Sequence, residues 1–208
     1  MKVLINFYAN VSEKTVNDMI MFLTQQIATN WSTIEEIIIQ ISSSWWSSDH
    51  WLLAYNFLKQ INIPKTVIWM WNVDSAAVMI FSAWDKRLSM PSCRFLLHEA
   101  RATMINWDFN STKLSEIAWM LERITDDYIQ VVTNISHLPI KSRKKKIKTI
   151  VHKWSSLSWE EAKDLWLVTE IIVEPYLQDM TNLAILVINN PNPPSQQLTQ
   201  TNWERIVI

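Results

Sequence analysis

The chain contains no glycine among its 208 residues. An average composition of about 7 % would give roughly 15 glycines in a chain of this length. Glycine normally takes the positions where φ is positive or where two backbone segments approach closely. Residues with side chains must therefore make every such turn here, and we expect this to damage the underlying fold.

Cysteine, long apolar runs and net charge are also scarce. The single Cys93 excludes an internal disulfide and is typical of a reducing compartment. No stretch approaches 18 uninterrupted apolar residues, and the apolar run within residues 1–7 is too short for a signal peptide. The net charge of −1 favours neither an acidic nor a basic partner. We expect a soluble cytoplasmic protein with no membrane segment.

Tryptophan, in contrast, occurs 13 times. Trp31, Trp107 and Trp203 each follow an asparagine, as glycine does in an Asn-Gly turn. Trp166 ends a short helical pattern, at the C′ position that glycine usually takes. We infer that each tryptophan stands at a position shaped for glycine.

Short apolar segments alternate with amphipathic ones along the chain. The predicted strands are residues 3–8, 37–41, 66–70, 95–97 and a last strand at 168–173. The predicted helices are residues 16–27, 52–61, 76–83 and 114–128. Ser158 and Glu161 have the spacing of a capping box. This alternation is typical of an α/β protein with right-handed crossovers.

One α/β domain over residues 1–186 is predicted, followed by a disordered tail over 187–208 that is rich in Asn, Pro, Gln and Thr. Residues 141–148 hold six Lys or Arg in eight positions. Such a run can bind nucleic acid or a membrane surface, although it is more often a solvated face. His50 and His137 have no metal-ligand companions at useful spacing, so neither a metal site nor a cofactor is expected.

Four segments follow, in order and spacing, the motifs of one protein family. Residues 39–46 are similar to a strand followed by Asn-Ser-Pro-Gly-Gly, with Trp45 and Trp46 at the glycine positions. The other segments match a Gly-x-x-x-Ser turn, an Ala-Gly-x-x-Arg…Pro…His stretch and a Ser-Ala-Glu-Glu-Ala…Gly-Leu-Val element. They are residues 67–77, 83–99 and 157–168. Over roughly residues 3–173 the chain resembles the proteolytic subunit of the Clp protease and its phage-type relatives.

The resemblance implies a ClpP/crotonase-like α/β spiral of strand-strand-helix units and the activity of a serine endopeptidase. Ser75 would be the nucleophile and His98 the general base, because a hydroxyl attacks well only when an imidazole removes its proton. Backbone N–H groups near Trp46 and Ala76 would form the oxyanion hole. Trp154 occupies the third position of the triad, where the family has an acid.

Without an acid at position 154, three other side chains could orient His98. They are His152, Asp126 and Asp127. The resemblance also implies a polypeptide substrate, a homo-oligomeric ring and an ATP-driven unfoldase as partner. It also leaves open a non-catalytic relative that keeps the fold and assembles.

A third hypothesis, independent of the resemblance, is a single-stranded nucleic-acid binder in which exposed aromatics stack on bases beside Lys and Arg. The placement of the tryptophans argues against this hypothesis, because the tryptophans occupy glycine positions and do not follow the spacing of a binding face.

A side chain in the left-handed region costs about 1–2 kcal/mol, and domains are stable by only about 5–15 kcal/mol. We therefore expect this chain to fold poorly and to have little peptidase activity.

Overall fold

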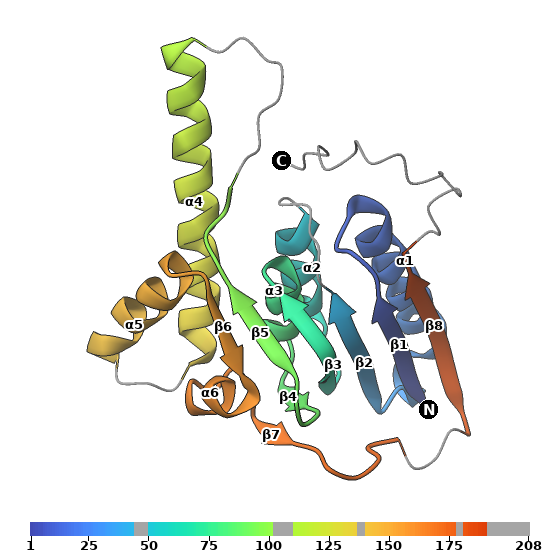
Figure 1. The fold of residues 1–208 in the computed structure, drawn as a ribbon. Coiled ribbons are helices and arrows are strands. Elements are labelled where there is room, and N and C mark those ends of the chain that lie inside the picture. Colours follow the sequence, from blue (N-terminus) through green and yellow to red (C-terminus); the bar gives the residue numbers. More distant parts are fainter. Residues whose placement is uncertain (44–49, 102–109, 137–139, 178–180, 191–208) are drawn as a thin grey trace, which may run out of the picture.

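The computed structural model describes residues 1–43, 50–101, 110–136, 140–177 and 181–190. An eight-stranded sheet lies at the centre, with the order β6-β5-β3-β2-β1-β8; β4 pairs with β3, and β7 pairs with β4 (Figure 1). The strands are β1 Lys2–Tyr8, β2 Glu36–Ser43, β3 Lys65–Asp74, β4 Lys86–Ser89, β5 Arg94–Leu97, β6 Ser155–Ser158, β7 Glu170–Ile171 and β8 Leu183–Asn189. The predicted mixed α/β class is confirmed.

The helices lie on one face of this sheet and at its end near β5 and β6 (Figure 1). They are α1 Glu13–Asn30, α2 His50–Gln60, α3 Ala76–Ser82, α4 Ser111–Ile135, α5 Ile140–His152 and α6 Trp159–Asp164, with a short 3₁₀ helix at Trp31–Thr33. α1, α2 and α3 lie together on one face of the sheet (Figure 1). The predicted capping box at Ser158 and Glu161 is present at the start of α6.

The central strands are parallel and buried on both faces. Ile37 and Ile39 of β2 pack into the main core under the helices, whereas Ile38 packs into a smaller cluster on the opposite face. In the described part of the chain, that cluster packs against strand residues and against a segment without helix that includes Ile172 and Tyr176. Because side chains alternate between the faces of a strand, a continuous apolar run such as this one suits a strand covered on both sides.

α4 packs against the domain only over part of its length. Its second half is buried, with Tyr128, Ile129 and Val132 in the main core. Its first half extends beyond the sheet, and Leu114 and Trp119 on it are exposed (Figure 1). The apolar stripe predicted over residues 114–128 therefore packs against the domain only at its C-terminal end.

The C-terminal part of the sheet differs from the sequence prediction. The last strand is not residues 168–173, of which only Glu170–Ile171 is extended as β7; it is β8, which pairs in parallel with β1. β4 and β6 were also not predicted. β8 continues through Asn189, so three residues assigned to the tail lie in the sheet. Its neighbour in the sheet, β1, lies far away in sequence, and local composition carries no signal for such a pairing.

The basic run lies on a helix. α5 buries Ile147 and Val151 and exposes Lys144, Lys145, Lys146 and Lys148. This arrangement is that of a helix with a solvated basic face.

Trp166 occupies the C′ position of α6, as predicted, with φ of 60°. Its N–H bonds to the carbonyl of Lys163 at 2.8 Å, and the N–H of Leu167 bonds to that of Ala162 at 2.9 Å. These two bonds form a Schellman motif, in which the C′ residue takes a left-handed conformation and is usually glycine. Trp166 therefore occupies a position whose backbone conformation favours glycine, which has only a hydrogen atom as its side chain.

The other described tryptophans divide into two groups. Trp154 also has a positive φ, of 54°. Trp31 begins the 3₁₀ helix with φ of −44°, so the Asn-Gly turn predicted there is wrong. Negative φ angles also occur at Trp51, Trp69, Trp71, Trp84, Trp119 and Trp159. Trp45, Trp46, Trp107 and Trp203 lie outside the described residues.

Two buried tryptophans have unfavourable environments in the core. Trp69 and Trp84 are fully buried, and neither indole N–H has a hydrogen-bond partner within the described part of the chain. The Trp69 ring centroid lies 3.5 Å from that of Phe95, closer than the 4.5–7 Å that aromatic pairs prefer. The close ring contact indicates that Trp69 is larger than its site favours, and each unpartnered indole N–H adds a desolvation cost.

We predict that Trp166→Gly raises the free energy of unfolding by about 1 kcal/mol, because glycine removes the left-handed penalty. The matched control is Trp119→Gly, in the exposed interior of α4, which should lower the free energy of unfolding by about 0.5 kcal/mol. Urea denaturation measures both. Destabilisation by both substitutions would contradict the prediction that position 166 is shaped for glycine.

Candidate active site

Ser75 lies in a sharp turn between a strand and a helix. It follows Asp74, the last residue of β3, and precedes the first residue of α3. Its φ of 51° and ψ of −113° are unusual for a residue with a side chain, and its N–H bonds to the carbonyl of Leu96 on β5 at 2.9 Å. The Ser75 side chain makes no capping hydrogen bond to the described first turn of α3. A role as a simple N-cap is thus not supported, and such strain is typical of functional sites.

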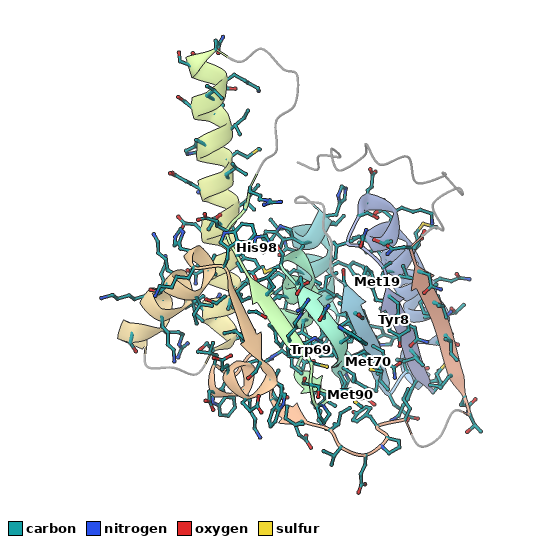
Figure 2. The ribbon with its side chains drawn as sticks, in the orientation of Figure 1. Tyr8, Met19, Trp69, Met70, Met90 and His98 are labelled. Carbon is teal, nitrogen blue, oxygen red and sulfur yellow. The ribbon has the colours of Figure 1, made fainter. Side chains whose placement is uncertain are left out.

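His98 follows β5 and is 4 % exposed. Figure 2 places it at the carboxyl end of that strand, beside α4. Its Nδ1 lies 2.7 Å from the main-chain oxygen of Glu99. Because a carbonyl oxygen can only accept, Nδ1 carries the hydrogen, and Nε2 has the lone pair that a general base needs.

Burial lowers the pKa of His98 below its usual 6.5. The positive charge of Arg101 lowers it further, while the hydrogen bond to Glu99 and the Glu99 carboxylate oppose the shift. Desolvation penalises the imidazolium more than the neutral ring. His98 is therefore neutral at pH 7.

The parallel pairing of β3 and β5 brings Ser75 and His98 to one place. Asp74 pairs with Leu96 in the register, so the residues that follow leave the sheet at the same edge. Both side chains line a small cavity of about 20 Å³, together with Trp51, Ala76, Thr125 and Tyr128. The two predicted reactive residues are thus neighbours, although 23 positions separate them in the sequence.

Trp154 lies against the predicted base. Its ring stacks on the His98 imidazole, with centroids 4.4 Å apart and planes 23° apart. The Arg101 guanidinium lies 5.3 Å from the centroid of the Trp154 ring. The position predicted for the acid is therefore beside His98, but an indole offers only an N–H donor and a ring face. It cannot accept a hydrogen bond from the imidazole as a carboxylate would.

The three alternative residues that could orient His98 have other contacts. His152 Nδ1 lies 2.6 Å from a carboxylate oxygen of Glu99, and Asp127 forms an ion pair with Arg123 at 3.8 Å. Asp126 lines a groove of about 510 Å³ between α4 and α5 with Glu99 and His152. In the described structure the acceptor at His98 Nδ1 is the main-chain carbonyl of Glu99.

Several other predicted or candidate residues have simple explanations. Cys93 is a free, buried cysteine whose thiol donates to the Trp69 carbonyl at 3.3 Å, and burial raises its pKa. Trp46, proposed for the oxyanion hole, and His137 lie outside the described residues. Within the described ranges, no group of three or more His, Cys, Asp and Glu side chains is placed to hold a metal ion.

Two buried polar residues beside the site were missed by the sequence analysis. Asp74, directly before Ser75, is buried, and burial raises its pKa while Arg94 and the Leu96 N–H oppose that shift. Tyr128 of α4 lines the cavity, and burial together with the Asp74 charge raises its pKa well above 10. The position of Asp74 directly before the predicted nucleophile could have identified it from the sequence. Tyr128 lies within an apolar helical stripe, and nothing in the sequence distinguishes it from a core residue.

Known proteins resemble this chain in sequence pattern and in fold. A family model for the Clp protease matches residues 2–175. The chain belongs to the Clp protease family. No curated protein sequence is a significant match.

Among solved structures, the fold is similar to that of a point mutant of ClpP1 from Listeria monocytogenes, with a TM-score of 0.67 and 20 % sequence identity. That match covers 82 % of this chain and 91 % of the ClpP1 chain. The predicted Clp-type fold and family are thereby confirmed. None of the helices in the described ranges has the length and apolar character needed to cross a bilayer.

We predict that nuclear magnetic resonance of ¹⁵N-labelled protein finds His98 as the Nδ1–H tautomer with a pKa below 6.5. The reason is the carbonyl at Nδ1 combined with burial, which disfavours the charged ring. A ring protonated on Nε2 alone, or a titration midpoint above 6.5, would contradict this assignment.

Proposed function

We propose that the chain is a Clp-type serine endopeptidase subunit in which Ser75 attacks the scissile carbonyl and His98 accepts its proton. The observation that carries this proposal is the strained turn at Ser75, which lies beside a neutral imidazole in one cavity. The family assignment adds to it. Neither residue alone would suffice, since a serine hydroxyl needs a neighbouring base to become nucleophilic.

In the proposed reaction, Ser75 Oγ forms a bond to the carbonyl carbon while its proton moves to Nε2 of His98. His98 then passes this proton to the leaving amine as the peptide bond breaks, and water later releases the acyl group. The Ala76 N–H, in the first turn of α3, would donate to the oxyanion, because first-turn N–H groups have no partner inside the helix. Trp46 would supply the second donor.

We further propose that the chain as it stands has low activity. Trp154 stands where the triad acid would bond to His98, and replacing that acid costs about 10⁴-fold in kcat in a serine protease triad. Trp71 is largely exposed on β3, in the strand that leads to Ser75. Its indole, with those of Trp45 and Trp46, stands at positions for which the family motifs have glycine.

The partners implied by the family are part of the proposal. A polypeptide is the substrate, and assembly into a homo-oligomeric ring is supported by the exposed apolar residues Leu114 and Trp119 on the protruding half of α4. An ATP-driven unfoldase would deliver the substrate. A cytoplasmic location is consistent with the free thiol of Cys93.

A non-catalytic assembly subunit is the second candidate function, and the stacking of Trp154 on His98 is the observation that favours it. The nucleic-acid hypothesis has less support. Trp69, one of the aromatics it depended on, is fully buried in the core and cannot stack on a base.

Ser75→Ala tests the nucleophile. We expect a fluorophosphonate probe to label the unchanged chain slowly and to leave the variant unlabelled, because only the Ser75 hydroxyl is activated by His98. Ser115→Ala, on the exposed half of α4, is the matched control and should label like the unchanged chain. Labelling of the Ser75→Ala variant, or no labelling of the unchanged chain, would favour the non-catalytic subunit.

Trp154→Asp tests the missing acid. We expect the labelling rate to rise by about 10²–10⁴-fold, since a carboxylate beside His98 stabilises the imidazolium that forms. The control is Trp154→Asn, which is similar in size, also tolerates a positive φ and carries no charge. Equal rates for the two variants would show that relief of crowding, and not the charge, causes any gain.

The pH dependence provides a second measure of the same variant. His98 acts as a base only when neutral, so a pKa below 6.5 places the acidic limb of the labelling rate below pH 6.5. An aspartate at position 154 raises the His98 pKa, because a nearby negative charge favours the imidazolium. The acidic limb should therefore move to higher pH in Trp154→Asp and stay in place in Trp154→Asn.

A further inference from the structure

The cavity that Ser75 and His98 line has one polar group with no assigned task. The Tyr128 side chain is 5 % exposed and forms part of the cavity wall. Its hydroxyl has no hydrogen-bond partner within the described residues. The neighbouring Thr125 differs, since its hydroxyl accepts the N–H of Ala100 at 2.9 Å. The rest of the wall includes apolar side chains such as Trp51 and Ile124.

A buried hydroxyl without a partner is costly, and native structures contain few of them. Asp74 is one candidate partner, since its charge acts on Tyr128. Among the described residues, the Asp74 Oδ1 nevertheless lacks a partner of its own, and no hydrogen bond joins the two side chains. No described protein group satisfies the Tyr128 hydroxyl, so a polar group bound in the cavity could become its partner.

The chemical state of this hydroxyl is settled by its surroundings. Burial and the Asp74 carboxylate raise the Tyr128 pKa well above 10, so the phenol remains protonated throughout the range in which proteins work. A protonated phenol both donates and accepts one hydrogen bond. It suits an uncharged polar group, such as a hydroxyl or an amide.

We propose that Tyr128 is a specificity-determining residue, whose hydroxyl binds a small polar side chain on the residue that precedes the scissile bond. The volume of about 20 Å³ limits that side chain to a size near serine. A site that bonds a hydroxyl disfavours an analogue that lacks it, because the buried polar group is then left unpaired. This inference rests on the proposed nucleophile Ser75.

The test uses two peptidyl diphenyl phosphonates that are identical except at this position. One carries the serine side chain and the other carries 2-aminobutyrate, which replaces the hydroxyl by a methyl group of similar size. Ser75 Oγ bonds to phosphorus, phenoxide leaves, and the serine proton passes to His98. The measured quantity is the ratio of the two inactivation rates on the full chain.

We expect the unchanged chain to react about 3- to 10-fold faster with the serine probe, as one neutral hydrogen bond implies. Tyr128→Phe should bring this ratio close to one. Tyr55→Phe, a half-buried tyrosine of α2 that does not line the cavity, is the control and should keep the ratio. Thermal denaturation of both variants verifies that they fold equally well.

Two results would overturn the inference. A ratio near one in the unchanged chain means that the cavity does not distinguish a hydroxyl from a methyl group. A ratio that Tyr128→Phe leaves unchanged, even if both rates fall, means that Tyr128 has only a structural role. The failure of the proposed function looks different, because a fluorophosphonate without any peptide would then also fail to label Ser75.

Discussion

The site depends on one hydrogen bond between two parallel strands, from the Ser75 N–H to the Leu96 carbonyl. This bond continues the pairing of β3 with β5 by one residue beyond Asp74, and it holds Ser75 in a turn with positive φ. His98 leaves the sheet two residues after Leu96. The same register between β3 and β5 therefore sets the position of the nucleophile and of the base.

At position 154 the chain keeps the location of the triad acid beside His98 but has no carboxylate there. The turn after α5 brings this residue against His98, where the triad needs an acceptor. The tryptophan fills the place with a flat ring that stacks on the imidazole. The main-chain carbonyl of Glu99 selects the useful tautomer instead. A carbonyl orients the ring, but it carries no full charge to stabilise the imidazolium, so orientation and electrostatic support are separated here.

The tryptophans act on the fold through two different constraints. At Trp154 and Trp166 the backbone has a positive φ, so any Cβ is unfavourable whatever the ring does. At Trp69 and Trp84 the torsions are ordinary, and the cost lies in volume and in a buried N–H without a partner among the described residues. The first cost is relieved by glycine and partly by asparagine or aspartate. The second is relieved by any small apolar residue.

The sequence by itself determined the strand-helix alternation and the C′ position of Trp166, because both rest on local patterns. The candidates Ser75, His98 and Trp154 came from the resemblance of its motifs to those of the Clp protease family. Only the tertiary structure decided that β8 joins the sheet beside β1, that the first half of α4 is exposed and that Tyr128 faces the cavity. The sequence of one strand does not show which strand it pairs with. A tyrosine in an apolar helical stripe does not show whether it lines a cavity. Those properties depend on contacts between residues far apart in the chain.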